Sequence, residues 1–496
     1  MISEVLNQTK VFLESMPKSV RKKKGQFFTS KESAIFMAGL FDLSIVGEHV
    51  EILDPGAGTG ILTAAIIERI DRCKHIKSVN ITCYETDEIV MDTLKANLEM
   101  IQKMSKKKVS YQIVEDDYLL TQSDDFEGIS NLKEFAKKYD IVIGNPPYLR
   151  VLRKHEAAVA LPSIVHGAPN LYFLFAAMSL FNLKDDCEMV YIIPRSWTSG
   201  AYFKAFRDYF LTNGKLVYIH LFASRDKVFD QEKVLQETMI VKVKKTTQQP
   251  SKVIISSTNA CNDFNEMTKI TLDYKDVVVG RNLYVFLPLN DYEVGVIRKI
   301  NKYVNTLPDE GLRMRTGIVV DFRQRNELRK EPGENIVPLF YSQHILEGRV
   351  CHHKIDKEYN WISCGKRSSV QKNRNYVFCK RFTAKEERRR LQSGIYLAED
   401  FCEYDMIGTQ NKINYVDDYE GNELTKEEVY GIYALLNSTL FDVYYRILNG
   451  STQVNSTEIN SIPVPSRNVI RNIGKNLMKS SKLTTEECDR VISVAY

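Results

Sequence analysis

The segment Asn145-Pro146-Pro147-Tyr148 closes the apolar run YDIVIG and carries residue types that can hold a planar amino compound. The amide oxygen of Asn145 and the carbonyl oxygen of Pro146 are two hydrogen-bond acceptors, and because proline restricts φ, the turn is preorganised. Two acceptors at this spacing can take both hydrogens of one –NH₂ group. The ring of Tyr148 offers a flat face on which a planar base can stack. The pattern predicts a site for an amino-bearing planar group.

A glycine-rich loop, Asp54-Pro55-Gly56-Ala57-Gly58-Thr59-Gly60, lies between an apolar run and a segment of helical spacing. Glycine permits positive φ and lets a ligand approach the backbone closely. A later apolar run ends in Tyr84-Glu85-Thr86-Asp87. An acidic residue about 25 residues beyond such a loop suits a bidentate grip on two ribose hydroxyls. No Walker lysine follows the loop, so we expect an adenosine-bearing cofactor that needs no phosphate cradle, rather than ATP.

These segments need a scaffold of strands to position them. Seven short apolar runs are typical of buried strands, and the segments TGILTAAIIERI and EIVMDTLKANLEMI between them have helical spacing. The expected strands are 50–55, 80–85, 111–116, 139–147, 188–194, 215–222 and 238–245. Alternating strands and helices indicate an α/β fold, with a mostly parallel sheet covered by helices on both faces.

The length of 496 residues allows about two to four domains. We expect an N-terminal lead-in at 1–24, a catalytic domain at 25–245 and a β-rich connection at 246–290, which begins with the polar segment TTQQPSK. A further domain at 291–496 holds Arg/Lys clusters, short strands and one helical stretch, 425–448.

Composition excludes several classes of protein. Apolar residues at 44% and charged residues at 26% are typical of soluble globular chains. The nearly uncharged stretch 171–183 is far shorter than the ~20 residues that span a bilayer. The first ten residues lack the apolar core of a signal peptide, so we expect a cytoplasmic protein with no membrane association. Cys351-His352-His353 with Cys364 matches no common zinc spacing, so no metal site is expected.

The order of the glycine loop, the acidic residue and NPPY resembles that of S-adenosylmethionine-dependent amino-methyltransferases. The finer resemblance is to the γ-type N6-adenine DNA methyltransferases of type II restriction–modification systems. It covers residues 20 to 466 and is specific in the catalytic half. It implies a Rossmann-like class I methyltransferase domain followed by a mixed α+β target-recognition domain, with S-adenosyl-L-methionine as the cofactor.

The resemblance also implies roles for individual residues. Gly25-Gln26-Phe27-Phe28-Thr29 is similar to the leading cofactor motif, and Glu115-Asp116-Asp117-Tyr118 is similar to the segment that holds the cofactor's adenine. Asp117 is aligned with the acid that bonds the adenine amino group, and Asp116 is the competing choice. The NLY…F helix supplies an aromatic ring near the cofactor. The implied cofactor-binding residues are Thr29, Asp54, Gly56, Gly58, Gly60, Glu85, Thr86, Asp117, Tyr118 and Phe175.

For the target base, the resemblance implies catalysis by Asn145, Pro146, Pro147 and Tyr148, with the extruded adenine between Tyr148 and Phe229. Arg195 lies in the strand end that shapes the target pocket. The mildly basic net charge of +5 requires any nucleic-acid surface to be a local patch. We expect DNA contacts from two clusters in the second half, one around the strand-like TGIVVDF with Arg323 and Arg325, the other at 380–390 with Lys380 and Arg381.

The function predicted from the sequence is a site-specific DNA adenine-N6 methyltransferase. It would act as a monomer on double-stranded DNA and protect it from a cognate restriction endonuclease that acts independently. One alternative is an NPPY enzyme acting on RNA or on cytosine N4, although cytosine N4 enzymes more often carry Ser in place of Asn145. The alternative from another class is a catalytically inactive DNA-binding protein, which loss of Asn145, Tyr148 or Glu85 would favour; all three are present.

Overall fold

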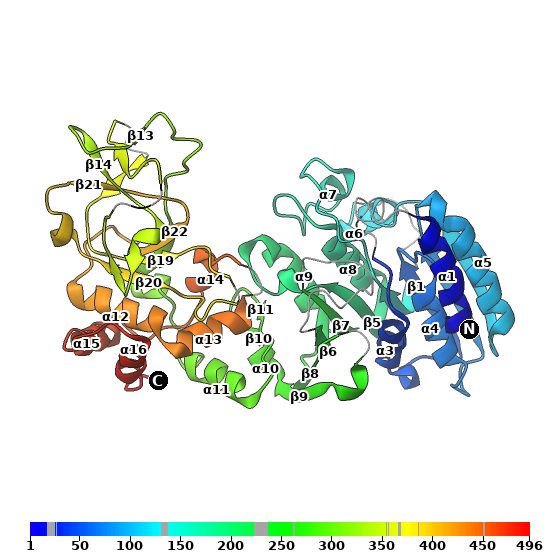
Figure 1. Cartoon of the computed structure of the whole chain (residues 1–496). Helices are drawn as coiled ribbons and strands as arrows, with labels where there is room; N and C mark the ends of the chain where they lie inside the picture. The colour runs from blue at the N-terminus through cyan, green and yellow to red at the C-terminus, as the bar shows by residue number, and fades with distance from the viewer. Residues whose placement is uncertain are drawn as a thin grey trace. The chain divides into compact units, whose positions relative to one another are not determined.

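The computed structural model divides the chain into two compact units, an N-terminal unit, Met1–Leu289, and a C-terminal unit, Asn290–Tyr496 (Figure 1). The structure describes residues 1–16, 25, 27–129, 137–222, 237–260, 263–353, 355, 357–365, 369–384, 386–449 and 452–496. Among these residues, no helix combines the length and the apolar character that crossing a bilayer would require.

A nine-stranded sheet forms the centre of the N-terminal unit, with strand order β3-β2-β1-β4-β5-β7-β6-β8-β9. Strands β1 to β5 are parallel to one another, whereas β7 runs antiparallel between β5 and β6. The strands are β1 (His49–Pro55), β2 (Ser78–Tyr84), β3 (Lys108–Val114), β4 (Tyr139–Gly144), β5 (Leu183–Pro194), β6 (Gly214–Phe222), β7 (Thr238–Lys245), β8 (Lys252–Thr258) and β9 (Thr268–Asp273). The mostly parallel sheet expected from the sequence is therefore confirmed.

Helices cover both faces of this sheet (Figure 1). Helices α1, α3, α4 and α5 pack against one another over β1, β2 and β4, while α8 and α9 pack on β5 and β6. Asp87 starts α5 by accepting a hydrogen bond from the Ile89 N–H, and Asn170 does the same for α8 through Tyr172. The helices are α1 (Ile2–Ser15), α3 (Lys31–Gly39), α4 (Ile61–Ile70), α5 (Glu88–Met104), α6 (Ser123–Phe126), α7 (Glu156–Ala160), α8 (Leu171–Asn182), α9 (Lys204–Asn213) and α10 (Tyr274–Val277).

The N-terminal unit extends past both ends of the 25–245 span expected for the catalytic domain. Helix α1, which lies in the expected lead-in, buries Ile2 and Val5 in the core. At the other end, β8 and β9 lengthen the sheet, followed by the hairpin of β10 (Val278–Val279) and β11 (Tyr284–Val285). Burial of apolar side chains makes β8 part of the N-terminal unit, because Val253 and Ile255 are fully buried although the surrounding sequence is polar.

The C-terminal unit is built on a six-stranded sheet, β12-β22-β19-β20-β16-β15, and a five-stranded sheet, β13-β17-β14-β21-β18. Its helices are α11 (Asp291–Ile300), α12 (Lys426–Asn437), α13 (Thr439–Leu448), α14 (Ser456–Ile459), α15 (Arg467–Leu477) and α16 (Thr485–Ile492). Its strands are β12 (Leu312–Thr316), β13 (Leu328–Arg329), β14 (Ile336–Phe340), β15 (Ile345–Leu346), β16 (Arg349–Val350), β17 (Trp361–Ser363), β18 (Gln371–Lys372), β19 (Tyr376–Lys380), β20 (Ser393–Tyr396), β21 (Met406–Thr409) and β22 (Ile413–Asp418).

One local expectation for this unit is confirmed with a break in it, and another was wrong. The helical stretch 425–448 is two helices, because the Ser438 hydroxyl accepts the Phe441 N–H and so begins α13 anew. The strand-like segment TGIVVDF contributes only Thr316 to a strand. From Gly317 on, the backbone turns, with hydrogen bonds from Gly317 N to Ile413 O and from Val319 N to Thr409 O.

Candidate active site

A cavity of about 510 Å³ opens at the carboxyl ends of β1, β2 and β4. The strand register places these ends side by side, since Pro55 at the end of β1 pairs with Tyr84 at the end of β2. Eleven residues predicted from the sequence line this cavity: Thr29, Gly56, Gly58, Glu85, Thr86, Asp117, Tyr118, Asn145, Pro146, Pro147 and Phe175. Asp54, Gly60 and Tyr148 are not among the residues that line it.

The glycine loop is folded onto the end of β2. Gly56 and Gly58 have φ of 77° and 54°, so both adopt the left-handed conformation that favours glycine. The N–H groups of Gly56 and Ala57 donate to the Tyr84 carbonyl, each at 2.9 Å. The loop therefore presents its backbone to the cavity at the position that the sequence predicts.

Glu85 is fixed by three backbone donors at the cavity wall. Its Oε2 accepts from the Gly58 N–H, and its Oε1 accepts from the N–H groups of Thr86 and Asp87, each at 2.9 Å. Burial raises the pKa of Glu85, and the three hydrogen bonds oppose that rise. The arrangement orients a carboxylate whose remaining lone pairs can accept from a diol.

Asp54 lies beneath the loop, buried, and not at the cavity surface. Its Oδ2 accepts a hydrogen bond of 2.7 Å from the Thr63 hydroxyl, whereas Oδ1 is buried with no hydrogen-bond partner among the described residues. Burial raises the pKa of Asp54 to about 7, and the nearby charge of Glu85 adds to the rise. Asp54 thus supports the loop from below.

An aromatic group forms another side of the cavity. The buried Tyr118 ring lies 4.9 Å from the Tyr84 ring and 5.4 Å from the Phe175 ring, centroid to centroid. The Tyr118 hydroxyl donates to Asn182 at 2.9 Å, which fixes the ring. Asp117 accepts from the N–H groups of Leu119 and Leu120 through Oδ1. A planar ring system could stack here with an acid beside it.

The Asn145 side chain has a defined orientation. Its Nδ2 donates to the Phe27 carbonyl at 2.7 Å and to the Thr29 hydroxyl at 3.0 Å, so both of its N–H bonds have acceptors. Its Oδ1 is buried with no hydrogen-bond partner among the described residues. Because both donors are engaged, only the acceptor of this amide remains for a further partner.

Tyr148 ends the NPPY turn and is held through both its hydroxyl and its backbone N–H. Its hydroxyl donates to the Ile192 carbonyl at 2.9 Å, and its ring lies 5.2 Å from the Phe27 ring. The Tyr148 N–H donates to the Gly25 carbonyl at 3.0 Å. Gly25 has a φ of 68°, and a Cβ there would come within 3.0 Å of the Tyr148 backbone. The leading motif and the NPPY turn therefore pack directly together.

Some residues near the site carried no role in the sequence analysis. The Thr9 hydroxyl of α1 bonds to the Thr59 hydroxyl at 2.8 Å and so braces the glycine loop. Leu149, His155 and Leu171 line the cavity. Apolar spacing in the sequence could have indicated α1, which carries Thr9. Proximity to recognised motifs could have indicated the three lining residues.

Several predicted substrate contacts lie apart from the cavity or outside the described residues. Arg195 forms an ion pair of 3.1 Å with Glu237 and does not line the cavity. Phe229 falls in 223–236, which is outside the described residues. Four predicted DNA contacts lie in the C-terminal unit, the exposed Arg323 and Arg325 and the half-buried Lys380 and Arg381.

Hydrogen bonds through Asn411 connect the segments that carry the two basic clusters. Asn411 donates its N–H to the Val319 carbonyl, and its own carbonyl accepts from Arg381 Nη1 at 3.0 Å. The turn after β12 and the end of β19 therefore lie at one end of the six-stranded sheet. In contrast, Arg313 and Arg315 both pair with Asp417.

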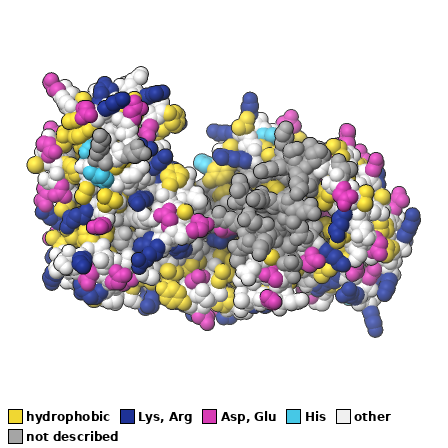
Figure 2. Space-filling model, in the orientation of Figure 1, with side chains coloured by type: hydrophobic (Ala, Val, Ile, Leu, Met, Phe, Trp, Pro, Cys, Tyr) yellow, Lys and Arg dark blue, Asp and Glu magenta, His cyan; other side chains and the backbone are white. Residues whose placement is uncertain are grey.

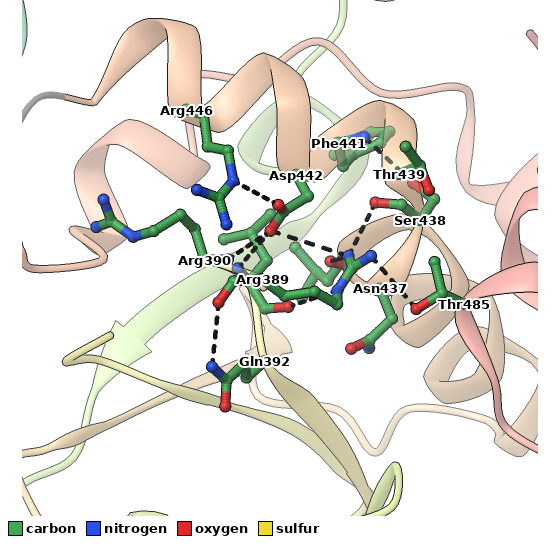
Figure 3. Close-up of polar contacts among 12 residues, drawn as sticks. Arg389, Arg390, Gln392, Asn437, Ser438, Thr439, Phe441, Asp442, Arg446 and Thr485 are labelled. Atoms are coloured by element: carbon green, nitrogen blue, oxygen red, sulfur yellow. Dashed lines mark hydrogen bonds and ion pairs between the residues drawn. The ribbon is translucent and has the colours of Figure 1, made fainter. Parts of the chain in front are cut away.

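Arg389 and Arg390 belong to the fold rather than to an exposed cluster (Figure 3). Arg389 donates to the Ser438 carbonyl at 2.9 Å, and the Arg390 side chain is buried. Asp442 accepts from the Arg390 N–H at 2.7 Å and from Arg446 Nε at 2.8 Å. The sequence grouped these arginines by proximity alone. Their hydrogen bonds to residues at and within α13 give both arginines a structural role.

Fold and site together define a class I S-adenosylmethionine-dependent methyltransferase, and comparison with known proteins narrows the class. A family model described as Eco57I restriction-modification methylase matches residues 61–229. The type II methyltransferase M.PstI of Providencia stuartii is 33% identical over 500 residues, covering 99% of this chain and 95% of that protein. M.BsuBI of Bacillus subtilis is 32% identical over 481 residues, covering 96% and 94%. The chain therefore belongs to the type II methyltransferases of restriction–modification systems.

Among solved structures, a nuclease-deletion mutant of the Type ISP restriction-modification enzyme LlaGI in complex with a DNA substrate mimic is similar with a TM-score of 0.50. The identity is 13%, and the match covers 91% of this chain and 46% of that one. This likeness concerns the fold alone. The fold class and the cofactor expected from the sequence are confirmed.

Proposed function

We propose that this protein is a site-specific DNA adenine-N6 methyltransferase, acting on an adenine flipped out of double-stranded DNA. The observation that carries the proposal is the orientation of Asn145. Both of its amide N–H bonds are engaged, Oδ1 is buried without a partner among the described residues, and Asn145 lines the cavity. A buried acceptor without a donor is costly, and an exocyclic amino group supplies that donor.

The cavity fits the cofactor. Glu85 offers an oriented carboxylate for the ribose hydroxyls, Tyr118 and Phe175 offer aromatic surface for the adenine, and Asp117 an acceptor for its amino group. Gly56 and Gly58 open the backbone to close approach. S-adenosylmethionine supplies the electrophilic methyl group.

The chain's own residues position the target. Asn145 Oδ1 and the Pro146 carbonyl accept the two amino hydrogens, which builds electron density on N6 and turns its lone pair toward the methyl group. The Tyr148 ring stacks on the base, and its hydroxyl bond to Ile192 keeps the ring in place. No strongly basic side chain is needed, because the proton leaves N6 after transfer, when the nitrogen is transiently cationic. Extruding the base costs a few kcal/mol.

The family supports a proposal for the biological role. Relatives named type II methyltransferases support DNA modification that protects a site from a cognate restriction endonuclease. The endonuclease would act independently, and this chain would act as a monomer on each strand of the site.

Methyl transfer from labelled S-adenosylmethionine to varied genomic DNA tests the proposal, with modified nucleosides identified by mass spectrometry. We expect N6-methyladenine from the wild type and its loss in Asn145→Ala, while cofactor binding persists. Asn213→Ala, which changes an exposed asparagine on α9, is the matched control. N4-methylcytosine would overturn the choice of base. No DNA product, with cofactor still bound, would favour an RNA substrate or an inactive DNA-binding protein.

A further inference from the structure

The chain leaves the NPPY turn along the rim of the cavity. Leu149 and His155 both line the cavity, and Leu152 lies midway between them in sequence. The Leu152 side chain is 66% exposed. Leu152 therefore lies on the short segment that joins two residues of the cavity wall.

Hydrogen bonds hold Leu152 in this exposed position. Leu171 N donates to the Leu149 carbonyl at 2.9 Å, and Val151 N donates to the Pro169 carbonyl at 2.8 Å. His155 N donates to the Leu152 carbonyl at 2.9 Å, which closes a turn. The Val151 side chain is buried beneath the rim. The exposure of Leu152 is therefore a consequence of an anchored backbone.

The same turn carries a concentration of positive charge. Arg150, Arg153 and Lys154 are exposed, and none forms an ion pair with an acidic side chain in the described part of the chain. Figure 2 shows dark blue side chains gathered over the region of α7 on this face. Three unpaired cations around one exposed leucine are suited to a surface with regularly spaced negative charge and an apolar interior, which describes duplex DNA.

We propose that Leu152 inserts into the base stack where the target adenine leaves it, while Arg150, Arg153 and Lys154 hold the neighbouring phosphates. The inference rests on the proposed function. Extrusion leaves a gap that water or the neighbouring bases would otherwise fill, and an apolar side chain in the gap stabilises the extruded state. The cations fix the rim against the backbone, so that the leucine lies beside the base that enters the cavity.

Two duplexes built on the mapped methylation site test this role, one fully paired and one with an abasic position opposite the target adenine. We expect Leu152→Ala to slow single-turnover methylation of the paired duplex by about 10- to 100-fold, because part of the unstacking cost is no longer offset. The abasic duplex should restore most of that loss, since its adenine is already unpaired. Leu152→Met, which keeps apolar volume, should stay within about threefold of the wild type.

Val159→Ala is the matched control, because Val159 lies on α7 and is 63% exposed. With 2-aminopurine at the target position, wild type and Val159→Ala should raise fluorescence alike, whereas Leu152→Ala should raise it less. Equal rates of wild type and Leu152→Ala on the paired duplex would overturn the inference, as would an equal loss on both duplexes. Absence of adenine methylation by the wild type would instead overturn the proposed function.

Discussion

The Asn145 amide donates a hydrogen bond of 2.7 Å to the carbonyl oxygen of Phe27, a residue 118 positions earlier in the chain. Thr29 receives the second amide hydrogen at 3.0 Å. The leading motif therefore fixes which way the Asn145 amide points, in addition to lining the cavity. An amide with both donors engaged can only accept, so any further partner must be a hydrogen-bond donor, such as an amino group.

Thr29→Val should slow methyl transfer by between about 3- and 10-fold, because one neutral hydrogen bond that orients Asn145 is lost while the shape of the side chain is kept. Thr29→Ser, which retains the hydroxyl, should remain near the wild type. Single-turnover rates with saturating cofactor provide the measurement. Equal rates for the Val and Ser variants would show that the Thr29 hydroxyl does not orient the amide.

Cofactor affinity should fall as the pH is lowered from 8 to 5. Burial raises the pKa of Glu85, so its carboxylate is protonated at a higher pH than that of an exposed glutamate and then loses acceptor capacity. Glu85→Gln should weaken binding by about tenfold or more and remove most of this pH dependence, since its amide nitrogen would face backbone donors. Calorimetric titration of S-adenosylmethionine across this range checks both. An unchanged pH profile in Glu85→Gln would contradict the assignment.

Asp54→Asn should stabilise the cofactor-free protein at pH 8. The pKa of Asp54 rises from an ordinary value near 3.8 to about 7 in the fold, so the folded state holds a proton that the unfolded state has lost. The stability from this proton is fully present below the unfolded pKa and disappears as the pH rises through 7. The variant should flatten the dependence of the melting temperature on pH between 4 and 8. A wild-type melting temperature that rises across this window would contradict the prediction.

Replacing Arg150, Arg153 and Lys154 together by serine should lower the slope of log Kd against log salt concentration. Each phosphate contact contributes about 0.9 to that slope, so a reduction of up to about 3 is expected. Lys95, Lys103 and Lys106, which are exposed on or just after α5, give a control with the same change of charge. Fluorescence anisotropy with a labelled duplex, repeated at several salt concentrations, measures the slope for each triple variant. Equal slopes for the two triple variants would show that net charge alone matters.

Asp442→Ala should lower the melting temperature rather than act through DNA contact. Asp442 accepts from the N–H groups of Arg390 and Leu391 and pairs with Arg446, so its loss leaves buried donors unsatisfied. Each such group costs about 1–3 kcal/mol. Thermal unfolding in the absence of DNA is the measurement. Asp489→Ala, which removes the solvent-exposed hydrogen bonds that Asp489 accepts from Thr439, should cost less. Equal melting temperatures of wild type and Asp442→Ala would contradict the structural role.

The catalytic half was largely predictable from the sequence, whereas the C-terminal half was not. Strands 139–147 and 238–245 were expected because strands buried on both faces consist of continuous apolar runs, and the structure has them at Tyr139–Gly144 and Thr238–Lys245. The break at Ser438 was missed because the apolar spacing of 425–448 continues through it, and only the cap hydrogen bond to Phe441 separates α12 from α13. Likewise, the buried arginine Arg390 is indistinguishable in sequence from exposed Arg388.

By itself the sequence determined the order of the motifs along the chain: a glycine loop, an acidic residue after the second strand and NPPY after the fourth strand. These motifs depend on local backbone geometry, and neighbouring residues encode that geometry. Tertiary structure alone decided that Phe27 and Thr29 orient the Asn145 amide, that Asp54 lies buried with a pKa of about 7, and that Leu152 is held exposed. Orientation, burial and exposure arise from contacts between distant segments, and no single segment contains that information.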